Sequence, residues 1–177
     1  MKTNVRPIEA SDVPSLIEVR GMTRENAISP EGLRALGITP EAVVQKLSTS
    51  HRGWLCEVNQ RIVGFAIGDG ATGELWVIAV LPEFEGRRIG SRLLLLVEDW
   101  LWSLSWEEIW LWTSVDERMR AFAFYIAHGW RKCEIRGGVL HMRKQISNNE
   151  SGRTRASVAG RAAERAAPTG RVAHLQP

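Results

Sequence analysis

The chain has 177 residues, of which 44% are hydrophobic and 24% are charged, a composition typical of one globular domain with a single hydrophobic core. The formal net charge is +3. Residues 145–177 hold five arginines and two glutamates, so the rest of the chain has 18 basic and 18 acidic residues and no basic excess. A domain without a basic excess is not expected to bind nucleic acid.

Membrane segments, disulfides and metal sites are also disfavoured. The N-terminal residues are polar and charged, without the apolar core of a signal peptide, and no apolar run approaches the ~20 residues that span a bilayer. Cys56 and Cys133 are too few for a disulfide framework and have no metal-ligand spacing. We therefore expect a cytoplasmic protein with reduced thiols, no metal and no membrane partner.

In the N-terminal half the sequence predicts a strand, three helical segments and a three-stranded meander. The strand is expected at residues 4–7 and the first helix over 13–22. The next two helical segments share one start signal, a Ser or Thr followed by Pro and Glu, at residues 29–31 and 39–41. The three strands are expected at 54–58, 62–67 and 74–80.

In the C-terminal half the main predicted element is a long helix over residues 90–104. Trp102 lies off its apolar face, so we expect this side chain to be exposed, where it could take part in a homodimer contact. A strand at 109–113 and a helix over 118–128 follow, and then a hairpin with strands at 130–134 and 139–143. The apolar residues of the long helix recur at helical spacing and predict one buried face: Leu93, Leu96, Val97, Trp100, Leu101 and Leu104.

This order of elements predicts an α/β fold with a mixed, mostly antiparallel central sheet flanked by helices, because three strands follow one another without a helix between them. The domain is expected to span residues 1–144. Residues 145–177 are rich in Ala, Gly, Ser and Arg and poor in large apolar residues. Because such a segment cannot offset its ordering entropy by burial, we expect a disordered basic tail.

The segment with the most specific chemistry lies between the last meander strand and the long helix. A loop with Gly86, Arg87, Arg88 and Gly90 leads into this helix, whose first N–H groups have no partner within the helix. Such a helix start favours an anion, and the two arginines suit a phosphate or pyrophosphate group. The glycine spacing fits neither a dinucleotide-binding fingerprint nor a P-loop. A different class of nucleotide-like cofactor is therefore expected.

The loop resembles that of the GNAT superfamily, the acyl-CoA-dependent N-acetyltransferases, whose pattern is Gln/Arg-x-x-Gly-x-Gly/Ala. Glu85, Arg88 and Gly90 occupy the three defining positions here, and only Gly90 fits. The resemblance extends over residues 4–143, and its surrounding order is more specific than the loop. That order comprises a strand ending Ile78-Ala79-Val80, then Pro82, Phe84, the loop, a Leu-rich helix, a strand, Ala121-Phe-Ala-Phe-Tyr125 and Gly129-Trp130.

This resemblance implies acetyl-CoA as the cosubstrate. Ile78, Ala79 and Val80 would pair with its pantetheine arm as if that arm were an added strand. Arg88 replaces a family glycine and loses easy access to positive φ, but backbone donors survive the substitution and a guanidinium is itself a phosphate partner. The residues implied to hold the pyrophosphate are Gly86, Arg87, Arg88, Ile89, Gly90 and Ser91.

The resemblance also implies two catalytic residues. Tyr125, the only tyrosine, takes the position of the residue that protonates the departing thiolate, and a phenol of pKa ~10 holds its proton at neutral pH. Packing in the core is the alternative role. Glu74, four residues before Ile78, matches the general base of some relatives, with a water chain as the alternative. Glu25 and Asn26 lie in the region that forms one wall of the acceptor site and could bind a polar or cationic acceptor.

The sequence therefore predicts an enzyme that transfers an acetyl group from acetyl-CoA directly to a primary amine, without a covalent enzyme intermediate. A small-molecule acceptor is favoured over a protein, although polyamines, amino acids, aminoglycosides and a protein N-terminus all stay open. The alternative is a non-catalytic acyl-CoA-binding or regulatory module, which the unusual Glu85 and Arg88 would favour.

Overall fold

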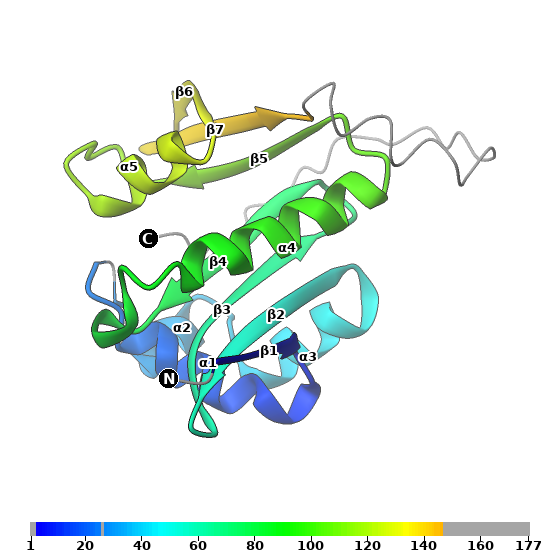
Figure 1. The fold of residues 1–177 in the computed structure, drawn as a ribbon, viewed down its shortest axis with the longest axis vertical. Coiled ribbons are helices and arrows are strands. Elements are labelled where there is room, and N and C mark those ends of the chain that lie inside the picture. Colours follow the sequence, from blue (N-terminus) through cyan, green and yellow to red (C-terminus); the bar gives the residue numbers. More distant parts are fainter. Residues whose placement is uncertain (1–2, 26, 147–177) are drawn as a thin grey trace.

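The computed structural model describes residues 3–25 and 27–146, and its strands form one mixed sheet of seven strands (Figure 1). The strands are β1 (Thr3–Pro7), β2 (His51–Val58), β3 (Arg61–Asp69), β4 (Glu74–Val80), β5 (Glu108–Thr113), β6 (Arg131–Arg136) and β7 (Val139–Gln145). Their order in the sheet is β1-β2-β3-β4-β5-β7-β6. Neighbouring strands are antiparallel except β4 and β5, which are parallel. The predicted α/β fold with a mostly antiparallel mixed sheet is confirmed.

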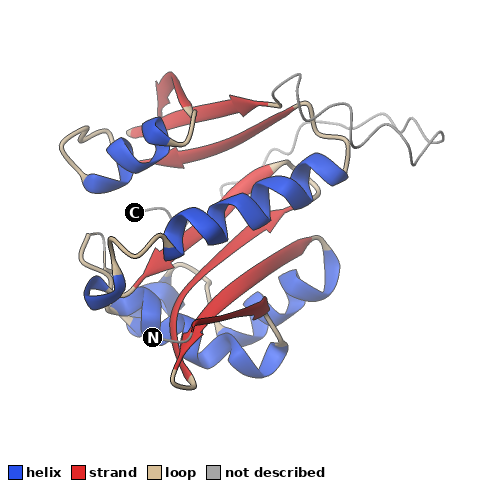
Figure 2. Ribbon diagram, in the orientation of Figure 1, coloured by secondary structure: helices blue, strands red, loops and turns tan. Residues whose placement is uncertain are grey.

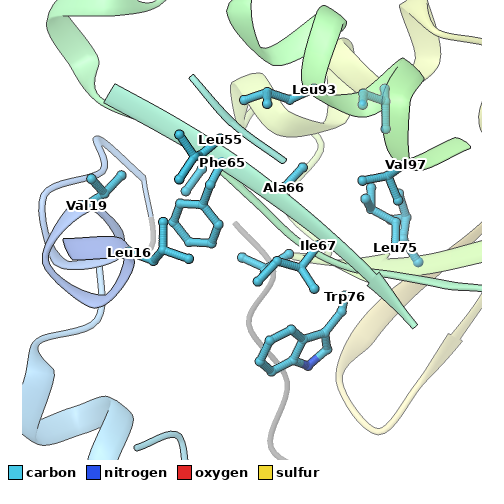
Figure 3. Close-up of a cluster of buried hydrophobic side chains, with 14 of the residues drawn as sticks. Leu16, Val19, Leu55, Phe65, Ala66, Ile67, Leu75, Trp76, Leu93 and Val97 are labelled. Atoms are coloured by element: carbon cyan, nitrogen blue, oxygen red, sulfur yellow. The ribbon is translucent and has the colours of Figure 1, made fainter. Parts of the chain in front are cut away.

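Helices cover both faces of this sheet (Figure 2). They are α1 (Val13–Gly21), α2 (Pro30–Ala35), α3 (Pro40–Thr49), α4 (Ile89–Ser103) and α5 (Arg120–Ala127), with short 3-10 turns at Ala10–Asp12 and Pro82–Phe84. α1 and α3 pack on β2, β3 and β4, and α4 packs on the same strands. Figure 3 shows that Leu16 of α1 and Leu93 of α4 reach the sheet from opposite sides.

The local signals read from the sequence form as expected. Ser29 and Thr39 each accept a hydrogen bond from the backbone N–H three residues later, at 3.1 and 3.2 Å, and so cap α2 and α3. Between β2 and β3, Asn59 and Gln60 both adopt positive φ, 51° and 65°, as a two-residue type I′ hairpin turn requires.

One expectation about α4 is wrong. Trp102 is only 6% exposed, so it offers no surface for a dimer contact, whereas Leu104, just past the helix, is 46% exposed. Leu94, Glu98 and Trp102 form a second buried stripe at four-residue spacing. This stripe exists because the β5–β7 part of the sheet covers the helix from another side, where Lys144 of β7 meets Glu98 at 2.6 Å. A helix covered from two sides buries more than the single face that periodicity predicts.

The sheet is split in its middle, where β4 and β5 diverge. Among the described residues, the one ladder pair between these strands joins Glu74 to Trp110. From Ile78 through Val80, β4 therefore has no ladder partner on that edge, while its other edge pairs with β3. The edge of β4 that faces β5 is therefore open along the predicted cofactor segment, Ile78 to Val80.

A β-bulge at Trp76 changes which side of the sheet the residues of β4 face. Ile78 pairs with Ala66, but after a register shift Glu74 pairs with Asp69. Ala66 and Asp69 are an odd number of residues apart and so lie on opposite faces of β3, and paired residues share a face. Ile78 and Glu74 therefore face opposite sides, although simple alternation would put them on the same side.

β7 continues through Gln145, one residue beyond the expected end of the domain, and Ile146 donates its backbone N–H to Glu107 at 3.1 Å. The rest of the predicted tail, residues 147–177, lies outside the described residues.

Within the described part of the chain, no helix combines the length and apolar character needed to cross a bilayer.

Candidate active site

A pocket of about 370 Å³ lies where β4 and β5 separate. Its walls come from four segments that are distant in sequence: residues 23–25, 78–80, 84–91 and 120–125. Of the residues selected from the sequence, the pocket is lined by Glu25, Ile78, Ala79, Val80, Gly86, Arg88, Ile89, Gly90, Ser91 and Tyr125. Arg87 and Glu74 are not among its lining residues, and Asn26 lies outside the described residues.

The start of α4 supplies backbone donors to this pocket. The first hydrogen bond within the helix joins the N–H of Arg92 to the carbonyl of Arg88 at 3.0 Å. The amides of Ile89, Gly90 and Ser91 precede that bond, so the helix gives them no acceptor, and all three residues line the pocket. These amides and the positive end of the helix dipole make a site for an anion.

Arg88 takes the backbone conformation that the family's glycine would supply. Its φ is 61°, in the left-handed region, and Gly86 two residues earlier has a φ of 71°. For a residue with a Cβ this conformation costs roughly 1–2 kcal/mol. The backbone at this position thus keeps a left-handed conformation despite the substitution, and Arg88 lines the pocket.

The arginines that line the pocket differ from those expected from the sequence. The guanidinium of Arg87 lies over the ring of Phe84, 5.4 Å from its centroid. Arg24, in the loop after α1, and Arg120, the first residue of α5, line the pocket together with Arg88. Three arginines therefore line it, and two of them come from segments that the sequence did not connect with the anion loop.

Tyr125 combines a pocket position with complete burial. Its side chain lines the pocket, is 0% exposed and packs edge-on against Trp130 and Phe124, with ring centroids 6.0 and 5.5 Å apart. Burial raises the pKa of the phenol, an effect that the charge of Arg20 opposes. The hydroxyl therefore holds its proton across the neutral range, in a residue that lines the pocket.

Arg20 of α1 is a charged residue in the interior that sequence reasoning missed. Its side chain is only 3% exposed, and Nη1 donates to Thr23 Oγ1 at 3.1 Å. Thr23 in turn lines the pocket with Tyr125. Burial lowers the pKa of Arg20, and its interaction with the phenol opposes that shift. A cation in this position favours negative charge that develops at the phenol oxygen.

Glu74 is buried at the start of β4, beyond the bulge. It is 4% exposed, and Oε1 accepts a hydrogen bond from Trp112 Nε1 at 3.2 Å. Burial, reinforced by the charge of Asp69, raises the pKa of Glu74 to about 8. Four residues of strand separate it from Ile78, a span of about 13 Å. Glu74 therefore holds its proton more tightly than an ordinary carboxyl, and it does not line the pocket.

The carboxylate of Glu25 already has a partner. Both of its oxygens accept the backbone N–H of Arg120, at 3.1 and 3.0 Å, so that Glu25 caps the first turn of α5. It lines the pocket but is engaged in holding a helix start, which makes it a weaker candidate for binding an acceptor.

Among residues 3–25 and 27–146, no three His, Cys, Asp or Glu side chains come together as a metal site would require.

The split sheet and its amide-lined pocket define an acyl-CoA-dependent N-acetyltransferase. The acetyltransferase (GNAT) family profile matches residues 24–130, and the chain belongs to this family. Comparison with curated proteins gives no significant match.

Solved structures support the fold. The PaiA N-acetyltransferase of Thermoplasma acidophilum, in complex with coenzyme A, superposes with a TM-score of 0.72 at 20% identity, over 82% of this chain and 100% of that one. A GNAT-family acetyltransferase of Staphylococcus aureus Mu50 gives 0.69 at 20%, with the same coverage. The ribosomal-protein-S18-alanine N-acetyltransferase of Escherichia coli gives 0.65 at 18%, over 82% and 95%.

Proposed function

We propose that this protein transfers an acetyl group from acetyl-CoA to the primary amine of a small molecule. The observation that carries the proposal is the continuous wall of one pocket, which runs from the free edge of β4 to the first amides of α4 and includes Tyr125. A strand edge suits a ligand with amide groups, and a helix start suits one with phosphates. Acetyl-CoA has both, in that order along its length.

Binding would use backbone groups more than side chains. Ile78, Ala79 and Val80 would pair with the pantetheine arm along the free edge of β4, and the amides from Gly86 to Ser91 would hold the diphosphate. Arg88 would add its charge to those amides. Arg87 would contribute little, since its guanidinium lies over Phe84.

The reaction forms a C–N bond, breaks the thioester C–S bond and moves a proton from the amine to the sulfur. Glu74 in its ionised form, a fraction that grows as the pH rises toward its pKa of about 8, would take the amine proton through water, because the bulge and the strand length keep it from direct contact. Tyr125 would donate its phenolic proton to the departing thiolate and regain one from water. Arg20 would stabilise the charge left briefly on the phenol oxygen.

Replacement of Tyr125 by Phe tests this assignment. Phe keeps the ring contacts with Trp130 and Phe124, so the melting temperature and the Kd for CoA should change little. Loss of the proton donor should lower kcat by at least about tenfold, with the KM for acetyl-CoA nearly unchanged, in a free-thiol assay on the best amine of a library. Turnover equal to that of the parent would show that Tyr125 only packs in the core.

The same library separates an enzyme from a binding module. It should contain polyamines, amino acids, aminoglycosides and peptides with a free N-terminus. Thiol release with a small amine, and not with peptides, is the expected result. CoA binding without thiol release from any amine would favour a non-catalytic acyl-CoA-binding module.

A further inference from the structure

Three segments of the pocket wall meet at one carboxylate. Glu85, immediately before the anion loop, accepts a hydrogen bond from Arg24 Nε at 3.1 Å and another from Arg120 Nη1. All three residues line the pocket. A negative charge therefore lies inside a site that, on the proposed function, receives a ligand with several phosphate charges.

The two arginines are suited to exchange this carboxylate for another anion. A guanidinium offers five N–H donors in a planar fork that fits carboxylate and phosphate oxygens equally well. The side chains of Arg24 and Arg120 are 55% and 56% exposed, whereas that of Glu85 is 22% exposed. The arginine side chains can therefore turn toward a ligand without unpacking the core, and exposed ion pairs of this kind are weak enough to be replaced.

The backbone around them is held in place independently of that ion pair. Glu25 caps the backbone N–H of Arg120 through both of its oxygens. The start of α5 thus keeps its position next to the loop after α1 even when the Arg120 side chain changes partner.

We propose that Arg24 and Arg120 form a phosphate subsite of the acyl-CoA pocket, and that Glu85 fills this subsite as an internal anion when no phosphate is bound. The inference rests on the proposed function. Phosphate binding displaces the carboxylate from the guanidiniums, so Glu85 lowers the affinity for the cosubstrate. CoA has a diphosphate and a 3′-phosphate, and either one offers the oxygens that this subsite requires.

The first test removes the internal anion. Glu85→Gln should lower the Kd for CoA, measured by titration calorimetry, by about threefold to tenfold, since it frees two ion-paired arginines. Glu83→Gln is the matched control: Glu83 lies two residues away, pairs with Arg61 at 3.1 Å and does not line the pocket. Its Kd for CoA should equal that of the parent.

The second test asks what the arginines bind. Arg24→Gln and Arg120→Gln should each weaken CoA binding, and the loss should be larger in the Glu85→Gln background, where nothing competes with the phosphate. Arg118→Gln is the control, because Arg118 pairs with Asp116 at 2.8 Å outside the pocket. Dephospho-CoA identifies the source: the effects of the arginine variants persist if the diphosphate is bound and vanish if the 3′-phosphate is bound.

Two results would overturn the inference while the proposed function stands. One is a Kd for CoA of the Glu85→Gln variant that is equal to or higher than that of the parent. The other is an Arg120→Gln loss that disappears in the Glu85→Gln background, which would mean that the arginines serve only to hold Glu85. Failure of the parent protein to bind CoA would instead remove the proposed function and this inference together.

Discussion

Replacing Glu74 by Gln should remove a titration that weakens the fold as the pH rises. Glu74 is almost completely buried, and its pKa is raised to about 8 by burial and by the charge of Asp69. Glutamine has nearly the shape of the protonated acid, and its oxygen can still accept the hydrogen bond from Trp112. The substitution therefore fixes the side chain in its neutral form with little change in packing.

The size of the effect follows from linkage between protonation and folding. The folded protein binds this proton more tightly than the unfolded chain, whose carboxyl has its ordinary pKa of 4.5. The stabilisation is therefore complete below about pH 4.5 and is lost as the pH rises through about 8. At ~1.36 kcal/mol per pKa unit, the upper limit is about 5 kcal/mol. Because protein sites screen charge better than a dry interior does, we expect at least about 2 kcal/mol.

Urea unfolding at pH 5, 7 and 9 measures this difference. The free energy of unfolding of Glu74→Gln, relative to that of the parent, should be smallest at pH 5 and should rise by at least about 2 kcal/mol between pH 5 and pH 9. Glu83→Gln is the control for the same substitution at a side chain that is 51% exposed, and its free energy of unfolding should differ little from that of the parent. A difference for Glu74→Gln that does not grow with pH would refute the argument that burial raises the pKa of this carboxyl.

Five other substitutions test the loop and the core. Arg88→Glu should raise the Kd for CoA more than Arg87→Glu does, because only Arg88 lines the pocket. Gly90→Ala should keep the affinity for CoA and raise the free energy of unfolding by up to about 1 kcal/mol, since the added Cβ would lie 3.5 Å from Phe124, an ordinary contact. Gly86→Ala should lower the free energy of unfolding in urea by about 1 kcal/mol, because the φ of Gly86 is 71°. Glu98→Ala should cost about 1–3 kcal/mol by the same measurement, because it leaves the buried indole of Trp130 and the half-buried ammonium of Lys144 without their acceptor.

The features that the sequence predicted correctly depend on local signals. Ser29 and Thr39 cap their helices through residues three positions away. The place of Tyr125 in the pocket wall could be anticipated because a family motif surrounds it, while its catalytic role stays a prediction. Each of these inferences needs only a short window of sequence, so one chain is enough to make it.

The features that the sequence did not predict depend on contacts between distant segments. Alternation along β4 gives no hint of the bulge at Trp76, which is visible only in the pairing with β3. Trp102 was expected outside because helical periodicity cannot show that a second part of the sheet covers α4. The hydrogen-bonded cluster at Glu85 brings in Arg24 and Arg120 from 61 and 35 positions away, and no sequence motif links the three residues.

The unpaired side of β4 has a consequence for the protein without its ligand. From Ile78 to Val80 the strand presents backbone N–H and C=O groups along an edge inside the split sheet. Exposed strand edges are the usual starting points for aggregation, because any extended chain can add to them. A cosubstrate that covers this edge would prevent the strand of another molecule from pairing with it. Light scattering at high protein concentration should then show more association in the ligand-free protein than in the protein saturated with CoA.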